Sequence, residues 1–277
     1  MGTDLPDSPH VEPVVAVDPH DPDHLVAAAM VVRAPLTAGF ANSMTVHALV
    51  STDGGESWTR RRLPGLDGER PAGDPWLAWA EDGTLYLSCI GHVEGTEGHW
   101  SALLFGSADG GLTWSGPERV PFAERHDGWT DHPVIGTVDD RLYAFATGPF
   151  ASVSVSRTTR SGGGTFETLP TFTPDDRNNL LGSGVPFADG GFVFSYYSLS
   201  VPQPSPLWAI RPADDGADDG ADDGAGDGAG YRRAAITDEH IAVGFPMTAV
   251  DRSDWPRRDR TYAVWTRSFT RPHVMLA

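Results

Sequence analysis

The sequence predicts an all-β fold, a β-propeller of four-stranded antiparallel blades, of which about five are visible and the last is incomplete. Three observations predict this fold. A turn motif recurs at intervals of 56 and 52 residues, short apolar runs containing proline recur in phase with it, and no long stretch has the apolar spacing of an amphipathic helix. The 277 residues include 32 Gly and 23 Pro, so frequent turns are expected between the strands.

The turn motif follows the pattern S-x-D-x-G-x-[ST]-W, with two nearly identical copies at residues 51–58 and 107–114. In such a turn the Ser and Asp side chains can hydrogen-bond locally, Gly can adopt a positive φ, and the Trp ring can pack on the blade. A third copy at 159–166 has Ser161 in place of Asp and Phe166 in place of Trp. We expect that turn to keep its shape with less rigidity.

Each predicted unit begins with an apolar strand that a proline opens. These prolines are 53 to 62 residues apart, and they are Pro13, Pro75, Pro133, Pro186 and Pro246. A second apolar strand follows in each unit, at residues 24–30, 84–89, 141–146, 191–196 and 260–265. In the first three units a third strand leads into the turn motif, at 44–50, 102–106 and 151–158. Fourth strands are predicted after the turn, at 59–63 and 118–122.

These units predict one propeller domain over residues 1–277, because a single blade cannot bury both of its faces alone. In the fourth unit the turn motif is replaced by residues 213–230, an acidic low-complexity insert that we expect to be disordered. Its Asp-Asp-Gly repeats lack the spacing and closing Glu of an EF-hand, so we predict no calcium site there. The fifth unit reaches a third strand at 271–277 and lacks its outer strand, unless the N-terminal residues supply it.

Charge and cysteine content restrict the partners and cofactors. The formal net charge is −18, and −11 remains without the seven Asp of the insert, so nucleic acid is an unsuitable partner. Cys89 is the only cysteine, which excludes an internal disulfide and a zinc–cysteine site. The printed N-terminus has no signal-peptide pattern, and no apolar run is long enough for a membrane span. We expect a cytoplasmic protein as written, or a secreted one if the N-terminus is incomplete.

The two intact motifs resemble the Asp-box, or bacterial neuraminidase repeat, of sialidase-like propellers. With the in-phase strands, the resemblance covers most of the chain. It implies a sialidase-like glycoside hydrolase, with the alternative of a non-catalytic propeller that binds glycan or protein. In that superfamily the boxes lie on the outer edge, so the resemblance implies a structural role for Asp53 and Asp109.

Sialidases also use an Arg triad, a Tyr–Glu nucleophile pair and an Asp acid/base. The first Arg usually lies in an N-terminal motif, whereas the corresponding residues 8–13 contain no Arg. Arg211, Arg252 and Arg267 are the candidates for the later members, without a motif that identifies them.

Chemistry in a propeller is expected at the mouth of the central channel, where the innermost strands begin. The residue before each unit-opening proline is expected there, which gives Glu12, Asp74, Asp131 with His132, Val185 and Phe245. Two carboxylates facing a sugar can act as acid and base, and an inverting glycosidase holds them roughly 6.5–9.5 Å apart. We therefore predict Asp74, Asp131 and Glu12 as catalytic residues. The alternative is that Asp before Pro only starts a turn.

Side chains that can contact a carbohydrate ligand accompany these acids. We predict His132, Trp76, Trp129 and Tyr197 as ligand-binding residues, with Trp79 as a further aromatic candidate, because flat rings can pack against sugars. The alternative is that the rings only pack between blades. His132 beside Asp131 is not sufficient for a metal site. The sequence thus predicts a carbohydrate or protein ligand, with no cofactor, no metal and no membrane partner.

Overall fold

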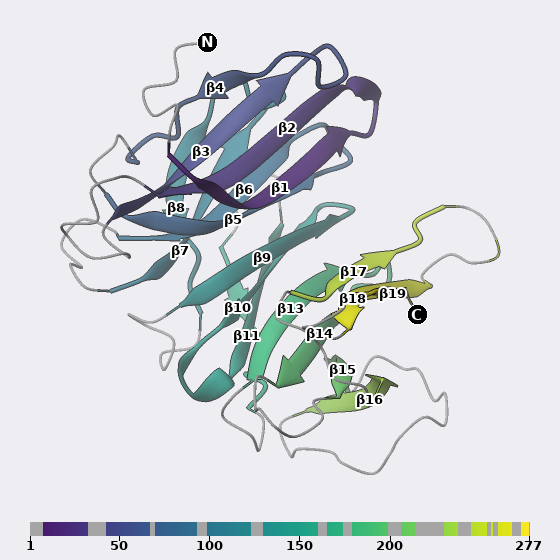
Figure 1. The fold of residues 1–277 in the computed structure, drawn as a ribbon. Helices are drawn as coiled ribbons and strands as arrows, with labels where there is room; N and C mark the ends of the chain where they lie inside the picture. Colours follow the sequence, from purple (N-terminus) through teal and green to yellow (C-terminus); the bar gives the residue numbers. More distant parts are fainter. Residues whose placement is uncertain are drawn as a thin grey trace.

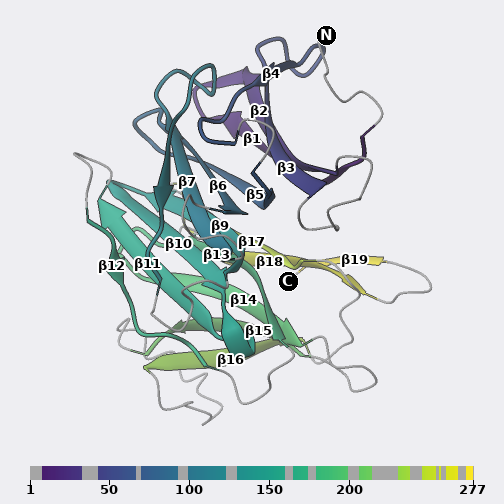
Figure 2. The ribbon, with the colours of Figure 1, turned by 90° about the vertical axis from the view of Figure 1, so that its left-hand side faces the viewer.

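The computed structural model describes thirteen parts of the chain. They are residues 8–32, 43–66, 70–92, 99–122, 130–159, 165–173, 179–198, 206–213, 230–237, 245–253, 256, 260–267 and 273–276. Five antiparallel sheets follow one another along the chain, and together they form a five-bladed β-propeller (Figures 1 and 2). Within the described residues, no helix is both long and apolar enough to cross a membrane.

The strands of each blade are consecutive in the sequence. Blade 1 contains β1 (His10–Asp18), β2 (Asp21–Val32), β3 (Met44–Ser51) and β4 (Thr59–Arg61). Blade 2 contains β5 (Ala72–Trp79), β6 (Leu85–Gly91), β7 (Ser101–Ser107) and β8 (Ser115–Arg119). Blade 3 contains β9 (Asp131–Val138), β10 (Arg141–Thr147), β11 (Val153–Thr159) and β12 (Glu167–Thr168), with the 3₁₀ turn η3 (Pro149–Ala151) between its middle strands. Blade 4 contains β13 (Asn179–Pro186), β14 (Phe192–Ser198), β15 (Leu207–Pro212) and β16 (Tyr231–Thr237). Blade 5 contains β17 (Met247–Val250), β18 (Thr261–Arg267) and β19 (His273–Leu276).

The blades stack through their first strands, which lie innermost (Figure 1). β5 contacts β1, β9 contacts β5, β13 contacts β9, and β17 contacts β13. Apolar side chains fill the interfaces between blades: one core joins blades 1 and 2 around Leu87 and Phe105, and another joins blades 3 and 4 around Phe145 and Phe194. The predicted all-β propeller with an incomplete last blade is confirmed, since blade 5 has three strands.

A β-bulge interrupts the innermost strand of each of the first four blades. In blade 1, Glu12 and Pro13 together lie opposite one residue of β2, and Asp74 with Pro75 and His132 with Pro133 repeat this arrangement in blades 2 and 3. In blades 1 to 3 the expectation that proline opens the strand was therefore wrong, because each of these strands begins two or three residues earlier. In blade 5, Pro246 directly precedes β17, as expected. A proline is tolerated at the bulge because the unpaired residue there needs no ladder hydrogen bond.

The fourth blade departs from the prediction. Its bulge contains Gly182 and Ser183, opposite a single residue of β14. Pro186 is the last residue of β13, so Val185 lies near the far end of the strand and not at the mouth. The sequence pattern failed here because the bulge carries no proline. Pro186 lies four residues after Gly182, the first bulge residue, and is unrelated to the bulge.

The Ser and Asp side chains of the two intact turn motifs make the same hydrogen bonds. In the second, Ser107 Oγ donates to Asp109 Oδ1 at 2.8 Å and accepts from the N–H of Gly111 at 2.7 Å. Asp109 also accepts from the backbone and side chain of Thr113, and these bonds lower its pKa. Asp53 is held in the same way by Ser57 and Ser51, which lower its pKa to about 2. Both turns follow third strands at the outer part of their blades, as expected.

Other predicted segments have mixed outcomes. The fourth strand of blade 2 is β8 and begins three residues before the predicted 118–122. Residues 160–164 of the third motif and 214–229 of the acidic insert lie outside the described residues. The ends of the insert are described: the N–H of Ala213 donates to the carbonyl of Gly230 at 2.9 Å, directly after β15 and before β16.

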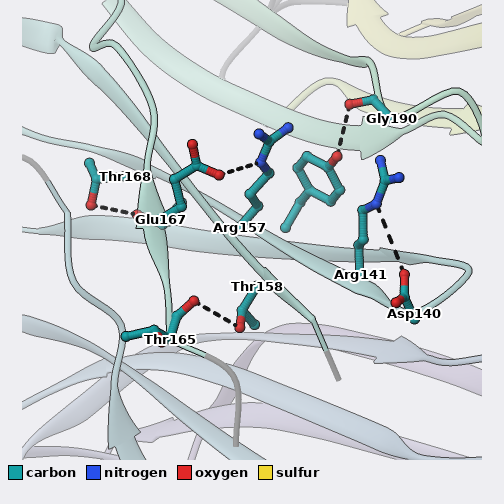
Figure 3. A network of polar contacts seen from close by, with 10 residues as sticks. Asp140, Arg141, Arg157, Thr158, Thr165, Glu167, Thr168 and Gly190 are labelled. Carbon is teal, nitrogen blue, oxygen red and sulfur yellow. Dashed lines mark hydrogen bonds and ion pairs between the residues drawn. The ribbon is translucent and has the colours of Figure 1, made fainter. Parts of the chain in front are cut away.

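A polar network links the outer strands of blade 3 and joins this blade to blade 4 (Figure 3). Arg157 on β11 donates to Glu167 on β12 at 2.9 Å, and Tyr143 Oη on β10 donates to the carbonyl of Gly190 at 2.8 Å. Because both members of the ion pair are partly exposed, it contributes little free energy of unfolding. The contact of Tyr143 with Gly190, by contrast, fixes the turn between β13 and β14 against the neighbouring blade.

Among the described strands, the two sheets at the ends of the chain do not pack closely on each other. Blades 1 and 5 stand apart in both views, and among the described strands no contact of the extent seen between successive blades joins β17 to β1 (Figures 1 and 2). Both sheets carry exposed apolar side chains. These are Val15 and Val17 on β1, and Met247, Val264, Val274 and Leu276 on blade 5. The described blades thus form an arc whose end sheets each have one uncovered face.

Candidate active site

The residues at the channel mouth have an unusual backbone. Glu12, Asp74 and His132 are the first bulge residues of three consecutive blades, and their φ angles are 51°, 52° and 49°. Residues other than Gly rarely adopt this left-handed region, where glycine has no steric penalty. Asp139 and Ala151 also have positive φ angles, but Glu12, Asp74 and His132 repeat this conformation at equivalent positions, which makes them candidates for a functional role.

Glu12, Asp74 and Asp131 form a chain of three carboxyl groups. The Asp74 carboxyl hydrogen-bonds that of Asp131 on one side and that of Glu12 on the other. The backbone N–H of His132 donates to Asp74 Oδ2 at 3.2 Å. Asp74 and Asp131 are half-buried, whereas Glu12 is exposed. Asp74 is therefore the middle of the chain, and Glu12 and Asp131 are its ends.

Asp74 and Asp131 have raised pKa values and retain protons up to nearly neutral pH. Burial raises the pKa of Asp74 to about 6, and the charge and hydrogen bond of Glu12 act in the same direction. Burial raises the pKa of Asp131 to about 7, and the charge and hydrogen bond of Asp74 add to this effect. Because two carboxylates in contact repel each other, Asp74 and Asp131 share a proton, which Asp131 donates to Asp74.

The predicted separation of Asp74 and Asp131 is wrong. A hydrogen bond between two carboxyl groups leaves no room for the water that an inverting glycosidase places between its acid and its base. The reason lies in the offset between blades 2 and 3. Asp74 is the first bulge residue of its blade, but Asp131 precedes the bulge of blade 3, and His132 occupies the position equivalent to Asp74.

His132 connects the mouth residues of several blades. Its Nε2–H donates to the carbonyl of Gly182 in blade 4 at 3.1 Å. Its ring meets Trp76 of blade 2 edge to face at 6.0 Å, and stacks on Phe245 next to blade 5 with the ring centroids 4.0 Å apart and the planes 12° apart. Burial lowers the pKa of His132, so the ring is neutral where Asp131 is ionised. His132 is therefore a neutral link between blades 2, 3, 4 and 5.

The other predicted aromatic residues have different positions. Tyr197 is buried, and its pKa is raised by burial and by the charge of Asp131, so it lies near that carboxyl. Trp76 is half-buried beside His132. Trp129 lies outside the described residues. Trp79 is wrongly placed by the prediction: it ends β5, at the opposite end of the channel from the mouth.

The arginine candidates do not form a triad in the described residues. The guanidinium of Arg252 donates to the carbonyls of Thr137 and Pro186, which lie near the ends of β9 and β13 away from the mouth. Arg211 lies on β15, two strands outward from the innermost strand of blade 4. The side chain of Arg267 lies outside the described residues. Arg252, one of the three candidates, thus joins three blades at the far end of the channel instead of lying at the mouth.

Sequence reasoning placed Phe245 at the mouth without a role and missed Gly182 entirely. The proline after Phe245 was the only signal for its position, and Gly182 has no such signal. No group of three or more His, Cys, Asp or Glu side chains that could hold a metal ion is found among the described residues.

Comparison with known proteins places the fold among propellers. Neither a family model nor a curated protein matches the chain. A solved structure of unknown function from Dyadobacter fermentans is similar, with a TM-score of 0.61 and 13% identity over 94% of this chain and 75% of that chain.

Two similar structures are enzymes that act on carbohydrates. The GH93 α-L-arabinofuranosidase of Fusarium graminearum, in complex with arabinobiose, has a TM-score of 0.58 and 13% identity over 94% of this chain and 75% of that chain. A Hadza microbial sialidase has a TM-score of 0.55 and 13% identity over 92% of this chain and 52% of that chain. At this identity the likeness shows the fold alone: the chain shares the β-propeller fold of these glycoside hydrolases.

Proposed function

We propose that the protein is a glycoside hydrolase of the Asp-box propeller type, with its active site at the channel mouth. The observation that carries the proposal is the chain of carboxyl groups Glu12–Asp74–Asp131, contributed by three consecutive blades. Most glycoside hydrolases use a pair of carboxyl groups that flank the scissile bond, one of them protonated and the other ionised. A chain of carboxyl groups with unequal pKa values provides both states at one pH.

Asp131 is the proton donor in this proposal. Its raised pKa keeps it protonated near neutral pH, so it can transfer the proton to the leaving glycosidic oxygen. Glu12, at the exposed end of the chain, is the carboxylate that activates water or attacks the sugar. Asp74 lies between them and holds the proton of Asp131 in place. The two ends of the chain, instead of Asp74 and Asp131, are therefore the pair that flanks the bond.

The similar structures support a carbohydrate substrate. One is an α-L-arabinofuranosidase with arabinobiose bound, and another is a sialidase. Both arabinosides and sialosides belong in the substrate screen. The described residues contain no arginine triad at the mouth that would single out a sialoside.

Turnover of fluorogenic glycosides tests the proposal. We expect hydrolysis of an aryl α-L-arabinofuranoside, sialoside or β-glucoside, and a loss of about two orders of magnitude or more in kcat for Asp131→Asn and for Glu12→Gln. Asp189→Asn is the matched control, since Asp189 is an exposed acid that accepts a hydrogen bond in the β13–β14 turn. Activity that survives both mouth substitutions would place the chemistry elsewhere.

A non-catalytic propeller that binds glycan or protein is the second candidate. It is favoured by the absence of an arginine from residues 8–13, where sialidases of this type carry the first arginine. In that case no substrate is turned over, and Asp131→Asn and Glu12→Gln change only the affinity for the ligand.

A further inference from the structure

Phe245 is the mouth residue of blade 5. It directly precedes Pro246 and β17, in the place where blades 1 to 3 carry Glu12, Asp74 and His132. It is also one of the few large apolar side chains that remain exposed, with 37% of its surface accessible. The Phe245 ring therefore keeps part of its surface accessible to a ligand while it contacts His132 at the mouth.

The space for this ring is provided by Gly182 in blade 4. A Cβ atom at Gly182 would lie 2.4 Å from Ser195 Oγ and 2.6 Å from the carbonyl oxygen of Pro246. Because no side chain is present there, the segment before β17 approaches β13 closely. Phe245 can then extend past blade 4 to stack on His132 of blade 3, which itself donates to the carbonyl of Gly182.

The stack fixes one face of the Phe245 ring and leaves the ring partly exposed. The His132 ring is held in place by its hydrogen bond to the carbonyl of Gly182 and by its edge-to-face contact with Trp76. It therefore fixes the orientation of the Phe245 ring that stacks on it. The residues next to His132 are Asp131, which carries the shared proton, and Asp74, which accepts the His132 N–H. The exposed ring is therefore linked to the carboxyl pair through His132, whose own backbone N–H donates to Asp74.

We propose that Phe245 is the stacking platform of a sugar-binding subsite, on which one ring of a carbohydrate lies beside the Asp74–Asp131 pair. Aromatic rings suit this role because a sugar presents a C–H face that packs on a flat apolar surface, while its hydroxyl groups reach polar side chains. The proposal rests on the proposed function in taking a carbohydrate as the ligand, but it requires binding only and no hydrolysis.

Binding of arabinobiose and of a sialyllactose probe, measured by titration calorimetry, tests the platform. We expect Phe245→Ala to weaken binding of whichever probe the wild type binds by about tenfold, and Phe245→Trp to retain it. Phe245→Leu separates stacking on a flat ring from simple shielding of His132. Leucine still shields His132 but has no flat face, so we expect this variant to bind as weakly as Phe245→Ala. Leu112→Ala is the control, since Leu112 is similarly exposed in the turn between β7 and β8 and this substitution should leave binding unchanged.

Each outcome decides between the two proposals. Binding that depends on Phe245 without any hydrolysis supports the platform and refutes the hydrolase. Hydrolysis with the same affinity in wild type and Phe245→Ala refutes the platform and leaves the hydrolase in place. Full retention of affinity in Phe245→Leu refutes stacking, because shielding of His132 by an apolar side chain would then be sufficient for binding. If the wild type binds neither probe, the platform is refuted.

Discussion

Aspartates in the turns and at the mouth of this protein have pKa values shifted in opposite directions. Hydrogen bonds lower the pKa of Asp53 to about 2, whereas burial raises that of Asp131 to about 7. A carboxyl group whose pKa is lower in the folded than in the unfolded state stabilises the fold at pH values above its unfolded pKa, which is near 3.8. This contribution is lost as the pH falls toward the folded pKa of about 2. A carboxyl group with a raised pKa destabilises the fold as the pH rises from about 4 through its folded value. The fold should therefore be most stable in mildly acidic solution.

Asp131→Asn tests this account at the mouth. Asparagine cannot ionise, so the variant avoids the cost of a buried charge that the wild type incurs above pH 7. We expect its melting temperature to exceed that of the wild type at pH 8, and the difference to shrink at pH 4. A melting temperature difference independent of pH between 4 and 8 would contradict the raised pKa.

Ser107 in the second turn is a buried hydroxyl with two partners. Ser107→Ala leaves the buried N–H of Gly111 without its acceptor and removes a donor to Asp109. We expect the free energy of unfolding to fall by an amount on the order of 1 kcal/mol. Ser115→Ala, at an exposed hydroxyl just after the same turn, is the control and should change it by less than about 0.5 kcal/mol. Equal effects in chemical denaturation would contradict the structural role of the turn.

At the scale of the strands, the bulge of blade 4 determines how closely blade 5 can approach. Gly182→Ala brings a Cβ into overlap with Ser195 Oγ and the backbone of Pro246, so β13 and the start of β17 must separate. We expect a loss of about 1–3 kcal/mol in the free energy of unfolding, since the nearest atoms include fixed backbone. Gly106→Ala is the control, because its Cβ would meet Ser115 Oγ at an ordinary 3.4 Å. A Gly182→Ala variant as stable as Gly106→Ala would show that blade 5 is not seated closely at this point.

The order of the strands and most of the strands themselves follow from the sequence, because most of them carry their own signal. The turn motifs and the proline-containing runs repeat at the spacing of a blade, and local hydrogen-bonding chemistry determines what they do. The positions of strand starts and bulges follow less well from the sequence. Pro13 and Pro75 mark a bulge instead of a strand start, and the bulge at Gly182 carries no proline.

The site was predicted as a set of residues but not as a geometry. Glu12, Asp74 and Asp131 do meet at the mouth, yet their contact depends on the offset between neighbouring blades, which no local pattern encodes. The stack of Phe245 on His132 joins residues 113 positions apart and spans an intervening blade, so it follows only from the assembled fold.

At the scale of the whole molecule, each blade contacts its immediate neighbours. The described strands show this in the succession of contacts from β1 to β5, β9, β13 and β17. Stability in such an array is close to a sum of terms for each unit and for each interface. Blades 2, 3 and 4 have two interfaces each, whereas blades 1 and 5 have one among the described residues.

The uncovered faces of the end blades thus have a consequence for the order in which the protein opens. A unit held by one interface can detach at a lower free energy than a unit held by two, so its backbone amides are exposed to solvent more often. We expect amide hydrogen exchange, followed by mass spectrometry, to be faster in β17–β19 than in β9 and β10, with blade 1 intermediate because its fourth strand completes the sheet. Uniform protection across the five sheets would mean that the molecule opens as one cooperative unit. With graded protection, the Phe245–His132 stack would break first, and the mouth would lose its ring platform before its carboxyl pair.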